Sequence, residues 1–200
     1  MQVESHYLTD ISGTALFYPC CGRDLELPLR LFASVISNFY FVDIRRPPRP
    51  QLVDIANPAP RSYLRSGGEA FLHLSVHNEF RIHRWKSRGE EALSEIPKLG
   101  VFFHRGDTLA NGEGSSGVPW LGRALFSIVL AKLVPGGLVV TDGSNRGRDG
   151  PRQLAQFHRN AQIKGGAVDA AFPFYYQDRR FTCLAYVGEK YGPTLIWRVA

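Results

Sequence analysis

Short apolar runs alternate with amphipathic segments along this chain. The runs are bounded by turn-forming residues, as buried strands are, and they are "TALFYP" (14–19), "NFYFVDI" (38–44), "GVFFHRGD" (100–107) and "GGLVVTDGSN" (136–145). The segments between them carry apolar residues at helical spacing or helix-start signals, at 24–37, 89–97, 118–134 and within 150–163. Strands that alternate with helices predict an α/β fold with a doubly wound, mostly parallel sheet.

Some stretches depart from this alternation. Residues 45–69 hold too many prolines for a regular helix, so we expect an irregular insertion there. The apolar stretches on either side of "HNE" (77–79) favour a hairpin or a bent strand, and the pattern leaves open which half joins the main sheet. At the end of the chain, "RRFTCLAYVG" (179–188), a turn and "TLIWRV" (194–199) predict an antiparallel β-hairpin.

The composition is that of an ordinary globular protein, with 44% hydrophobic and 21% charged residues among 200. A chain of this length suits one domain. No apolar stretch approaches the roughly 20 residues of a membrane-spanning helix, and the first residues lack a signal-peptide pattern. We therefore expect a single domain over 1–200 and a cytoplasmic protein without membrane contact. The 3 cysteines are expected to be free thiols.

The formal net charge is +6 and comes mostly from arginine, whose planar guanidinium suits carboxylate and phosphate groups. Much of the basic excess lies in "RRPPRP" (45–50), and the chain has no long basic run or lysine-rich tail. This balance favours a small-molecule or anionic substrate. Nucleic acid stays open as a less favoured partner.

Two polar features follow the first two predicted strands. The turn "LFYPCCGRD" (16–24) contains a single glycine, Gly22, and Asp43 ends the next strand at the spacing where an acid accepts hydrogen bonds from ribose hydroxyls. With the order of strands and helices and the terminal hairpin, these features resemble the class I S-adenosylmethionine-dependent methyltransferase family. The resemblance covers about residues 14–199. The family's sheet has seven strands, all parallel except the last.

The resemblance implies that S-adenosylmethionine is the cofactor and that the turn after the first strand approaches its methionine part. The family has an acid and three glycines in this turn. Here Tyr18 stands in place of the acid, Gly22 matches the central glycine, and the outer ones are replaced by Cys20 and Asp24. Positions 87–88, where the family often has an acid near adenine, hold no acid. The cofactor-binding residues that the resemblance implies are Tyr18, Pro19, Cys20, Cys21, Gly22, Asp24, Asp43, Ile44, Arg105 and Gly106.

Methyl transfer is an in-line displacement, so an enzyme chiefly aligns the acceptor and removes its proton where needed. Ligands of open α/β sheets bind beyond the carboxyl ends of the strands. Asp107, at the end of 100–107, is therefore the first candidate for a catalytic base, with His104 as the second. Because neighbouring side chains of a strand point to opposite faces, only part of this cluster can face one site.

The glycine-rich stretch "TLANGEGSSG" (108–117) precedes a helix and could offer N–H groups and hydroxyls to an anion. A flexible loop with a serine helix cap explains the same residues. "TDGSN" (141–145) lies at the next strand end, where ordinary turn chemistry is the alternative. The candidate substrate-binding residues are Ser115, Ser116, Trp120, Asp142 and Asn145.

Several chemistries have no pattern in the sequence. It has no helical histidine pair for a metal, no phosphate loop ending in Gly-Lys-Ser/Thr, no nucleophile elbow, and no Asn/Asp-Pro-Pro-aromatic motif after the fourth strand. No metal site is therefore expected, and nucleotide hydrolysis and base-amine methylation are disfavoured. Three functions stay open: a methyltransferase-like enzyme acting on a small or anionic acceptor, a non-catalytic binding or assembly module of the same fold, and, less favoured, an RNA- or DNA-binding module.

Overall fold

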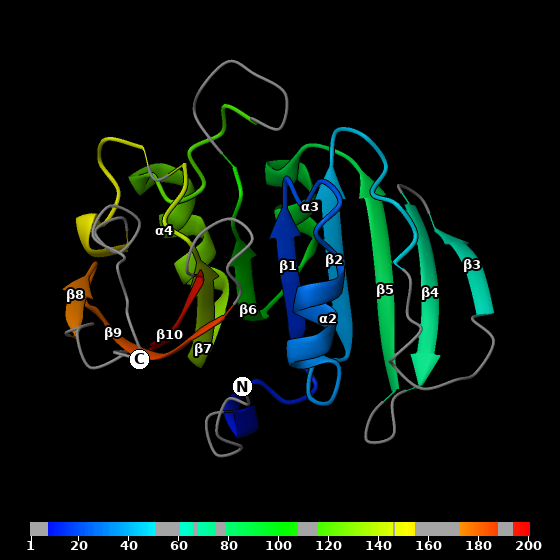
Figure 1. The fold of residues 1–200 in the computed structure, drawn as a ribbon, viewed down its shortest axis with the longest axis horizontal. Helices are drawn as coiled ribbons and strands as arrows, with labels where there is room; N and C mark the ends of the chain where they lie inside the picture. The colour runs from blue at the N-terminus through cyan, green and yellow to red at the C-terminus, as the bar shows by residue number, and fades with distance from the viewer. Residues whose placement is uncertain are drawn as a thin grey trace.

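One sheet organises the molecule in this computed structural model, which describes residues 8–50, 61–65, 68–74, 79–107, 116–145, 147–154, 173–187 and 194–200. Within these residues the sheet has 10 strands in the order β3-β4-β5-β2-β1-β6-β7-β10-β9-β8 (Figure 1). The strands are β1 (Ala15–Pro19), β2 (Asn38–Asp43), β3 (Arg61–Arg65), β4 (Gly68–Leu74), β5 (Glu79–Lys86), β6 (Leu99–His104), β7 (Leu133–Thr141), β8 (Phe174–Tyr176), β9 (Arg179–Val187) and β10 (Thr194–Val199). The helices are the short 3-10 helix η1 (Thr9–Ile11), α2 (Glu26–Phe32), α3 (Gly89–Glu95) and α4 (Arg123–Lys132).

The centre of the sheet is parallel. Strands β5, β2, β1, β6 and β7 pair in parallel in that order. β10 runs antiparallel to β7, and β9 runs antiparallel to β10, so β9 points the same way as the central strands. The prediction of an α/β sheet with a C-terminal antiparallel hairpin is confirmed. Strands β3, β4 and β8 add antiparallel pairs at the two edges.

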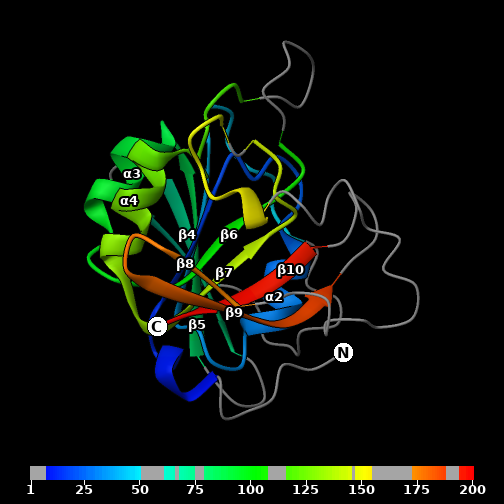
Figure 2. The same cartoon turned by 90° about the vertical axis from the view of Figure 1, so that its left-hand side faces the viewer.

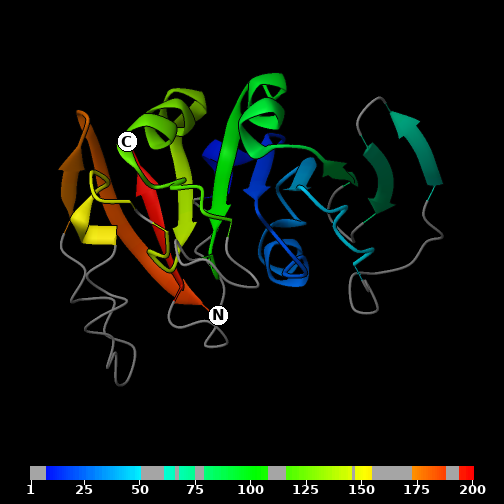
Figure 3. The same cartoon turned by 90° about the horizontal axis from the view of Figure 1, so that it is seen from above.

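Helices cover both faces of the sheet. Seen from above, α3 and α4 lie on one side and α2 on the other (Figure 3), and the view turned about the vertical axis shows the same division (Figure 2). Because side chains alternate along a strand, neighbours enter different layers. Phe17 packs in the cluster that includes α3 and α4, whereas Tyr18 packs in the cluster that includes α2. The sheet therefore separates two apolar cores.

The stretch 45–69 is not irregular throughout, which corrects the expectation from its prolines. β3 and the first residues of β4 lie within it and pair with each other, and both stretches beside 77–79 join the sheet as β4 and β5. Every proline of the stretch precedes Arg61. The residues after Pro60 therefore keep all their N–H donors for pairing.

Helix α4 begins later than its sequence pattern predicts. Pro119 lies in a preceding turn, in which the Gly122 N–H donates to the Pro119 carbonyl at 2.7 Å. The first helical residue is Arg123, whose N–H donates to Asp149 Oδ1 at 3.2 Å. The Asp149 carboxylate, distant in the sequence, thus accepts a hydrogen bond from a free N–H group at the helix start. No local sequence pattern predicts this contact.

The carboxyl ends of the central strands meet at one edge of the sheet. Parallel pairing places the connections that follow β5, β2, β1, β6 and β7 at this edge. Most of the candidate residues from the sequence lie on these connections, so the edge is where a site has to be sought.

Candidate functional site at the carboxyl edge

The turn after β1 adopts a backbone shape that glycine normally provides. Cys20 has a φ of 53° and Gly22 a φ of 54°, in the left-handed region where side chains are rarely found. Holding Cys20 there costs roughly 1–2 kcal/mol. A Cβ added at Gly22 would meet nothing within 4 Å. The turn therefore has two left-handed residues, of which only Gly22 is a glycine. The space beside Gly22 is open.

Asp43 fastens this turn to the end of β2. Its Oδ2 accepts a hydrogen bond from the Gly22 N–H at 3.1 Å, and its Oδ1 accepts one from the Arg45 N–H at 3.0 Å. The side chain remains partly exposed, and a carboxylate has room for about four hydrogen bonds. Ile44, the next residue, is 72% exposed. An acceptor and an apolar side chain thus adjoin each other at an open part of the edge.

An ion pair between buried Arg105 and partly buried Asp24 ties the same turn to the end of β6. The Arg105 guanidinium donates from Nε and Nη2 to the two oxygens of Asp24, at 2.5 and 2.8 Å, and from Nη1 to Thr194 Oγ1 at 3.4 Å. The Tyr18 hydroxyl lies 3.0 Å from Asp24 Oδ2 and 3.2 Å from the Arg105 carbonyl. Burial, with the Asp24 carboxylate, raises the pKa of Tyr18 and keeps its hydroxyl protonated. The turn is therefore locked on the face that α2 covers.

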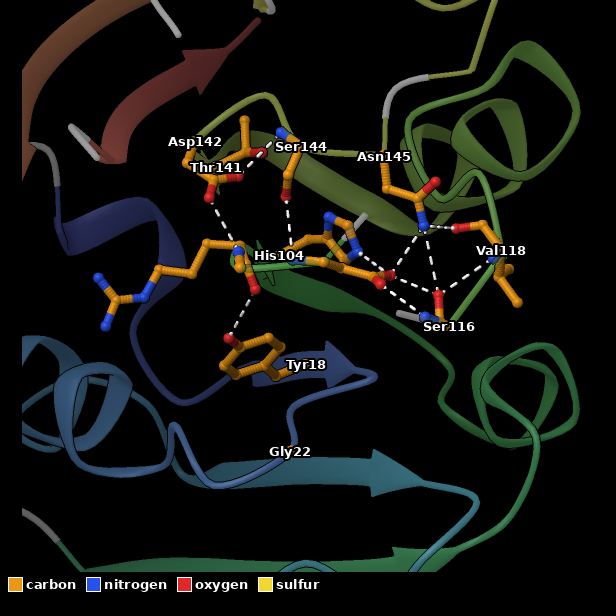
Figure 4. Close-up of polar contacts among 12 residues, drawn as sticks. Tyr18, Gly22, His104, Ser116, Val118, Thr141, Asp142, Ser144 and Asn145 are labelled. Atoms are coloured by element: carbon orange, nitrogen blue, oxygen red, sulfur yellow. Dashed lines mark hydrogen bonds and ion pairs between the residues drawn. The ribbon is translucent and has the colours of Figure 1, made fainter. Parts of the chain in front are cut away.

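A second polar cluster lies on the opposite face, where the His104 ring stacks on Phe102 of the core that α3 and α4 cover; Figure 4 labels its members His104, Ser116 and Asn145. Asp107 Oδ1 accepts the Ser116 N–H at 2.7 Å, and Oδ2 accepts from the Ser116 hydroxyl and from Asn145 Nδ2, the latter at 2.8 Å. His104 Nε2 lies 3.3 Å from the same Oδ2. Asn145 Nδ2 also donates to the Val118 carbonyl. Asp107 is thus the common acceptor that holds 116–118 and the turn after β7 against β6.

Asp107 is charged in these surroundings. Burial alone raises the pKa of its carboxyl, but the hydrogen bonds from His104, Ser116 and Asn145 outweigh burial and leave the pKa below its ordinary value. When His104 donates from Nε2, its Nδ1 becomes an acceptor. Among the described residues, His104 Nδ1 and Asn145 Oδ1 are buried without a hydrogen-bond partner. The cluster therefore combines one satisfied charge with two open acceptors.

Asp142 makes at the end of β7 the same two bonds that Asp43 makes at the end of β2. Its Oδ2 accepts the Gly106 N–H and its Oδ1 accepts the Ser144 N–H, both at 2.8 Å. The difference is burial, because Asp142 is only 3% exposed. It therefore braces two connections without presenting its oxygens to solvent.

Cys20 and Trp120 lie together on the face of the second cluster. Burial raises the pKa of the Cys20 thiol to about 11, so the thiol is neutral at pH 7. The Trp120 ring is fully buried and meets the Phe17 ring edge-on at 5.6 Å. This burial favours a packing role for Trp120 over the substrate contact suggested by the sequence.

The structure brings the predicted residues to one edge but divides them between its two faces, as alternation along β6 predicts. On the face of α3 and α4 lie His104, Asp107, Ser116, Asn145, Cys20 and Trp120. On the face of α2 lie Tyr18, Cys21, Asp24 and Arg105. Ser115 lies outside the described residues. The catalytic and binding roles of all these residues stay predictions.

The Asp24–Arg105 pair is the contact that sequence reasoning missed. The two residues are 81 positions apart, and no local pattern announces such a pair. The sequence likewise gives no signal for the contact between Arg105 and Thr194. In contrast, the turn at Asp142 carries a local signal, since an aspartate commonly accepts the N–H two residues further on.

No protein-family model, curated protein or solved structure matches this chain. Among the described residues, no group of three or more His, Cys, Asp and Glu side chains could hold a metal ion. None of the described helices is long and apolar enough to cross a membrane. The function therefore has to be argued from the sheet edge itself.

Proposed function

We propose that this protein binds S-adenosylmethionine at the carboxyl edge and acts as a class I methyltransferase-like enzyme on an anionic acceptor. The strand order supports this. Without the edge strands β3, β4 and β8, the sheet reads β5-β2-β1-β6-β7-β10-β9, and only the last strand of the chain, β10, is antiparallel. That is the strand pattern of the family that the sequence resembles.

The arrangement of Asp43 beside Gly22 carries the proposal. The two N–H groups that bind Asp43 fix its carboxylate, which is partly exposed and can accept further hydrogen bonds from ribose hydroxyls. Open space at Gly22 lets a ligand approach the backbone. Exposed Ile44 offers an apolar surface to an adenine ring. These residues fit the nucleoside part of S-adenosylmethionine.

When bound, S-adenosylmethionine would supply a methyl group from its sulfonium. The residues of this chain would orient the cofactor and remove the acceptor's proton. Asp107 already accepts from several donors, so in this proposal it positions His104 through Nε2. His104 Nδ1, which is buried and has no partner among the described residues, would take the proton once the acceptor reaches it. This refines the sequence expectation, in which Asp107 was the first candidate base.

Calorimetry with S-adenosylhomocysteine tests the proposal. The wild-type protein is expected to bind it, and Asp43→Ala to weaken binding at least tenfold, or about 1.4 kcal/mol, because the ribose loses its acceptor. Asp142→Ala is the matched control, since it removes the same two backbone bonds at a buried position. Its affinity below the melting temperature should equal that of the wild type. Absence of both heat and thermal shift with S-adenosylmethionine and S-adenosylhomocysteine would refute the proposal.

A non-catalytic binding or assembly module of the same fold is the second candidate. The contact of Tyr18 with Asp24 and Arg105 favours it, because the chain's own side chains occupy polar positions at the turn after β1. In that case neither ligand binds to the wild type, and Asp43→Ala changes no binding. A cofactor that stays with the protein through purification would contradict this candidate.

A further inference from the structure

Exposed cations surround Asp43 at the β1, β2 and β5 part of the carboxyl edge. They lie on or beside the connections that follow these strands. We call them the basic rim, and they are Arg23, Arg45, Arg46, Arg49, Lys86 and Arg88.

Backbone contacts bring the first two connections together. The Gly22 N–H and the Arg45 N–H donate to the same carboxylate of Asp43, at 3.1 and 3.0 Å. Arg23 follows Gly22 directly. Arg23 and Arg45 therefore leave the backbone on either side of one carboxylate, although they come from different connections.

The end of β5 adds cations on the other side of β2. Lys86 is the register partner of Asp43, and the Ser87 N–H donates to the Asp43 carbonyl at 3.1 Å. Arg88 follows Ser87. The turn after β1, the end of β2 and the end of β5 thus each contribute cations to this part of the edge.

The carboxylates nearby offset only part of this charge. Asp24 is paired with Arg105, and Asp43 lies among the rim cations and offsets one of their charges. Glu90 and Glu91 begin α3 and adjoin the β5 end of the rim. The positive excess is therefore largest along the connection after β2.

We propose that the basic rim binds phosphate groups of the acceptor. A guanidinium presents a planar fork of N–H donors that matches phosphate oxygens, often with two bonds at once. The three strands β1, β2 and β5 are neighbours in the sheet, each about 5 Å from the next, which is less than the roughly 8 Å over which physiological salt screens charges. Cations on several connections suit a ligand with more than one phosphate oxygen to bind. That the ligand is the methyl acceptor rests on the proposed function, whereas phosphate binding does not.

The experiment compares two double charge reversals of equal size. Arg46→Glu/Arg49→Glu inverts two exposed cations of the rim on the connection after β2 and leaves Asp43, Ile44 and Arg45 unchanged. Arg81→Glu/Lys98→Glu inverts two exposed cations at the amino ends of β5 and β6, on the opposite edge of the sheet. The probes are inorganic pyrophosphate, measured by calorimetry, and a single-stranded RNA longer than the roughly 4–16 nucleotides of one binding site, measured by fluorescence anisotropy at low and physiological salt.

The rim reversal is expected to weaken binding at least tenfold, and for RNA to lower the salt slope by roughly 0.7 for each lost phosphate contact. The control reversal should stay within twofold of the wild type. RNA binding without pyrophosphate binding identifies a nucleic-acid backbone as the source of the phosphates, and binding of pyrophosphate alone identifies a small phosphate ester. Binding of neither probe at low salt, or equal losses in both variants, overturns the proposal.

Calorimetry with S-adenosylhomocysteine separates this failure from that of the proposed function. The rim reversal leaves Asp43 and Gly22 in place, so it should bind S-adenosylhomocysteine as the wild type does. If the rim reversal loses phosphate binding but still binds S-adenosylhomocysteine, the variant is folded. Its loss of phosphate binding then comes from the reversed charges. Wild-type protein that binds phosphate but not S-adenosylhomocysteine would overturn the enzyme and the acceptor role together, while phosphate binding by the rim would stand.

Discussion

Asp43 and Asp142 have the same bonding at the ends of β2 and β7 and opposite exposure. Each carboxylate accepts the N–H of a glycine in the neighbouring connection and the N–H two residues ahead of itself. Asp142 is buried, whereas Asp43 is partly exposed. One bonding pattern thus makes a closed brace at β7 and an open acceptor at β2.

The surroundings of each residue cause this difference. Near β7, Asp107 draws Ser116 and Asn145 inward and fixes the segments that carry them over the edge. Near β2, the chain continues through exposed Ile44 and Arg45. A strand-ending aspartate can therefore offer its oxygens to a ligand only where no neighbouring segment covers it.

The largest loss of stability is expected for a substitution at Asp107, near the buried end of β7. Asp107→Asn should lower the free energy of unfolding by roughly 3 kcal/mol, because the donors of Ser116, His104 and Asn145 lose a buried charged acceptor. Urea unfolding at neutral pH measures this. Asp10→Asn is the control, since its ion pair with Arg198 is exposed and worth less than about 1 kcal/mol.

The same variant should change the acid dependence of stability. The folded pKa of Asp107 lies below its ordinary value of 3.8, so its contribution is complete above that value and is lost as pH falls through the folded pKa. The wild type should therefore lose stability below about pH 4 more steeply than Asp107→Asn. Parallel curves in acid would show that the Asp107 charge contributes nothing.

A smaller effect separates the two matched aspartates. Asp142→Ala should cost about 1–3 kcal/mol, since it leaves the N–H groups of Gly106 and Ser144 without their acceptor at a buried position. Asp43→Ala should cost less than about 1 kcal/mol, because water can reach exposed Gly22 and Arg45. Urea unfolding of both variants gives the comparison. Equal losses would mean that the open and closed sides do not differ as described.

Local patterns predicted much of the fold because they were strong and short in range. The apolar runs located β1, β2, β6 and β7, and the terminal hairpin followed from two strand patterns around a turn. The start of α4 could not be predicted, since Asp149 caps it from 26 residues away. β3 was missed because prolines just before it masked a segment that pairs normally.

The sequence predicted where the candidate site residues lie better than it predicted their hydrogen-bond partners. A strand end followed by polar residues pointed to Asp43, Asp107 and Asp142, and all three lie at the carboxyl edge. Which face each serves depends on distant partners. Arg105 adjoins His104 in sequence, yet it reaches Asp24 on the other face.

The smallest predicted change in stability concerns Cys20. This residue stands in the turn after β1 at a position where a glycine loop would have glycine. Cys20→Ala and Cys20→Gly both remove the thiol, so their difference reports the backbone alone. At most positions glycine is the less stable of the two. Here the φ of 53° reverses this, and Cys20→Gly should be more stable than Cys20→Ala by about 1 kcal/mol in urea unfolding. The control is Gly22→Ala, which should lose about as much for the same reason. If Cys20→Ala proved the more stable variant, the left-handed backbone at position 20 would be wrong, and with it the likeness of this turn to a glycine loop.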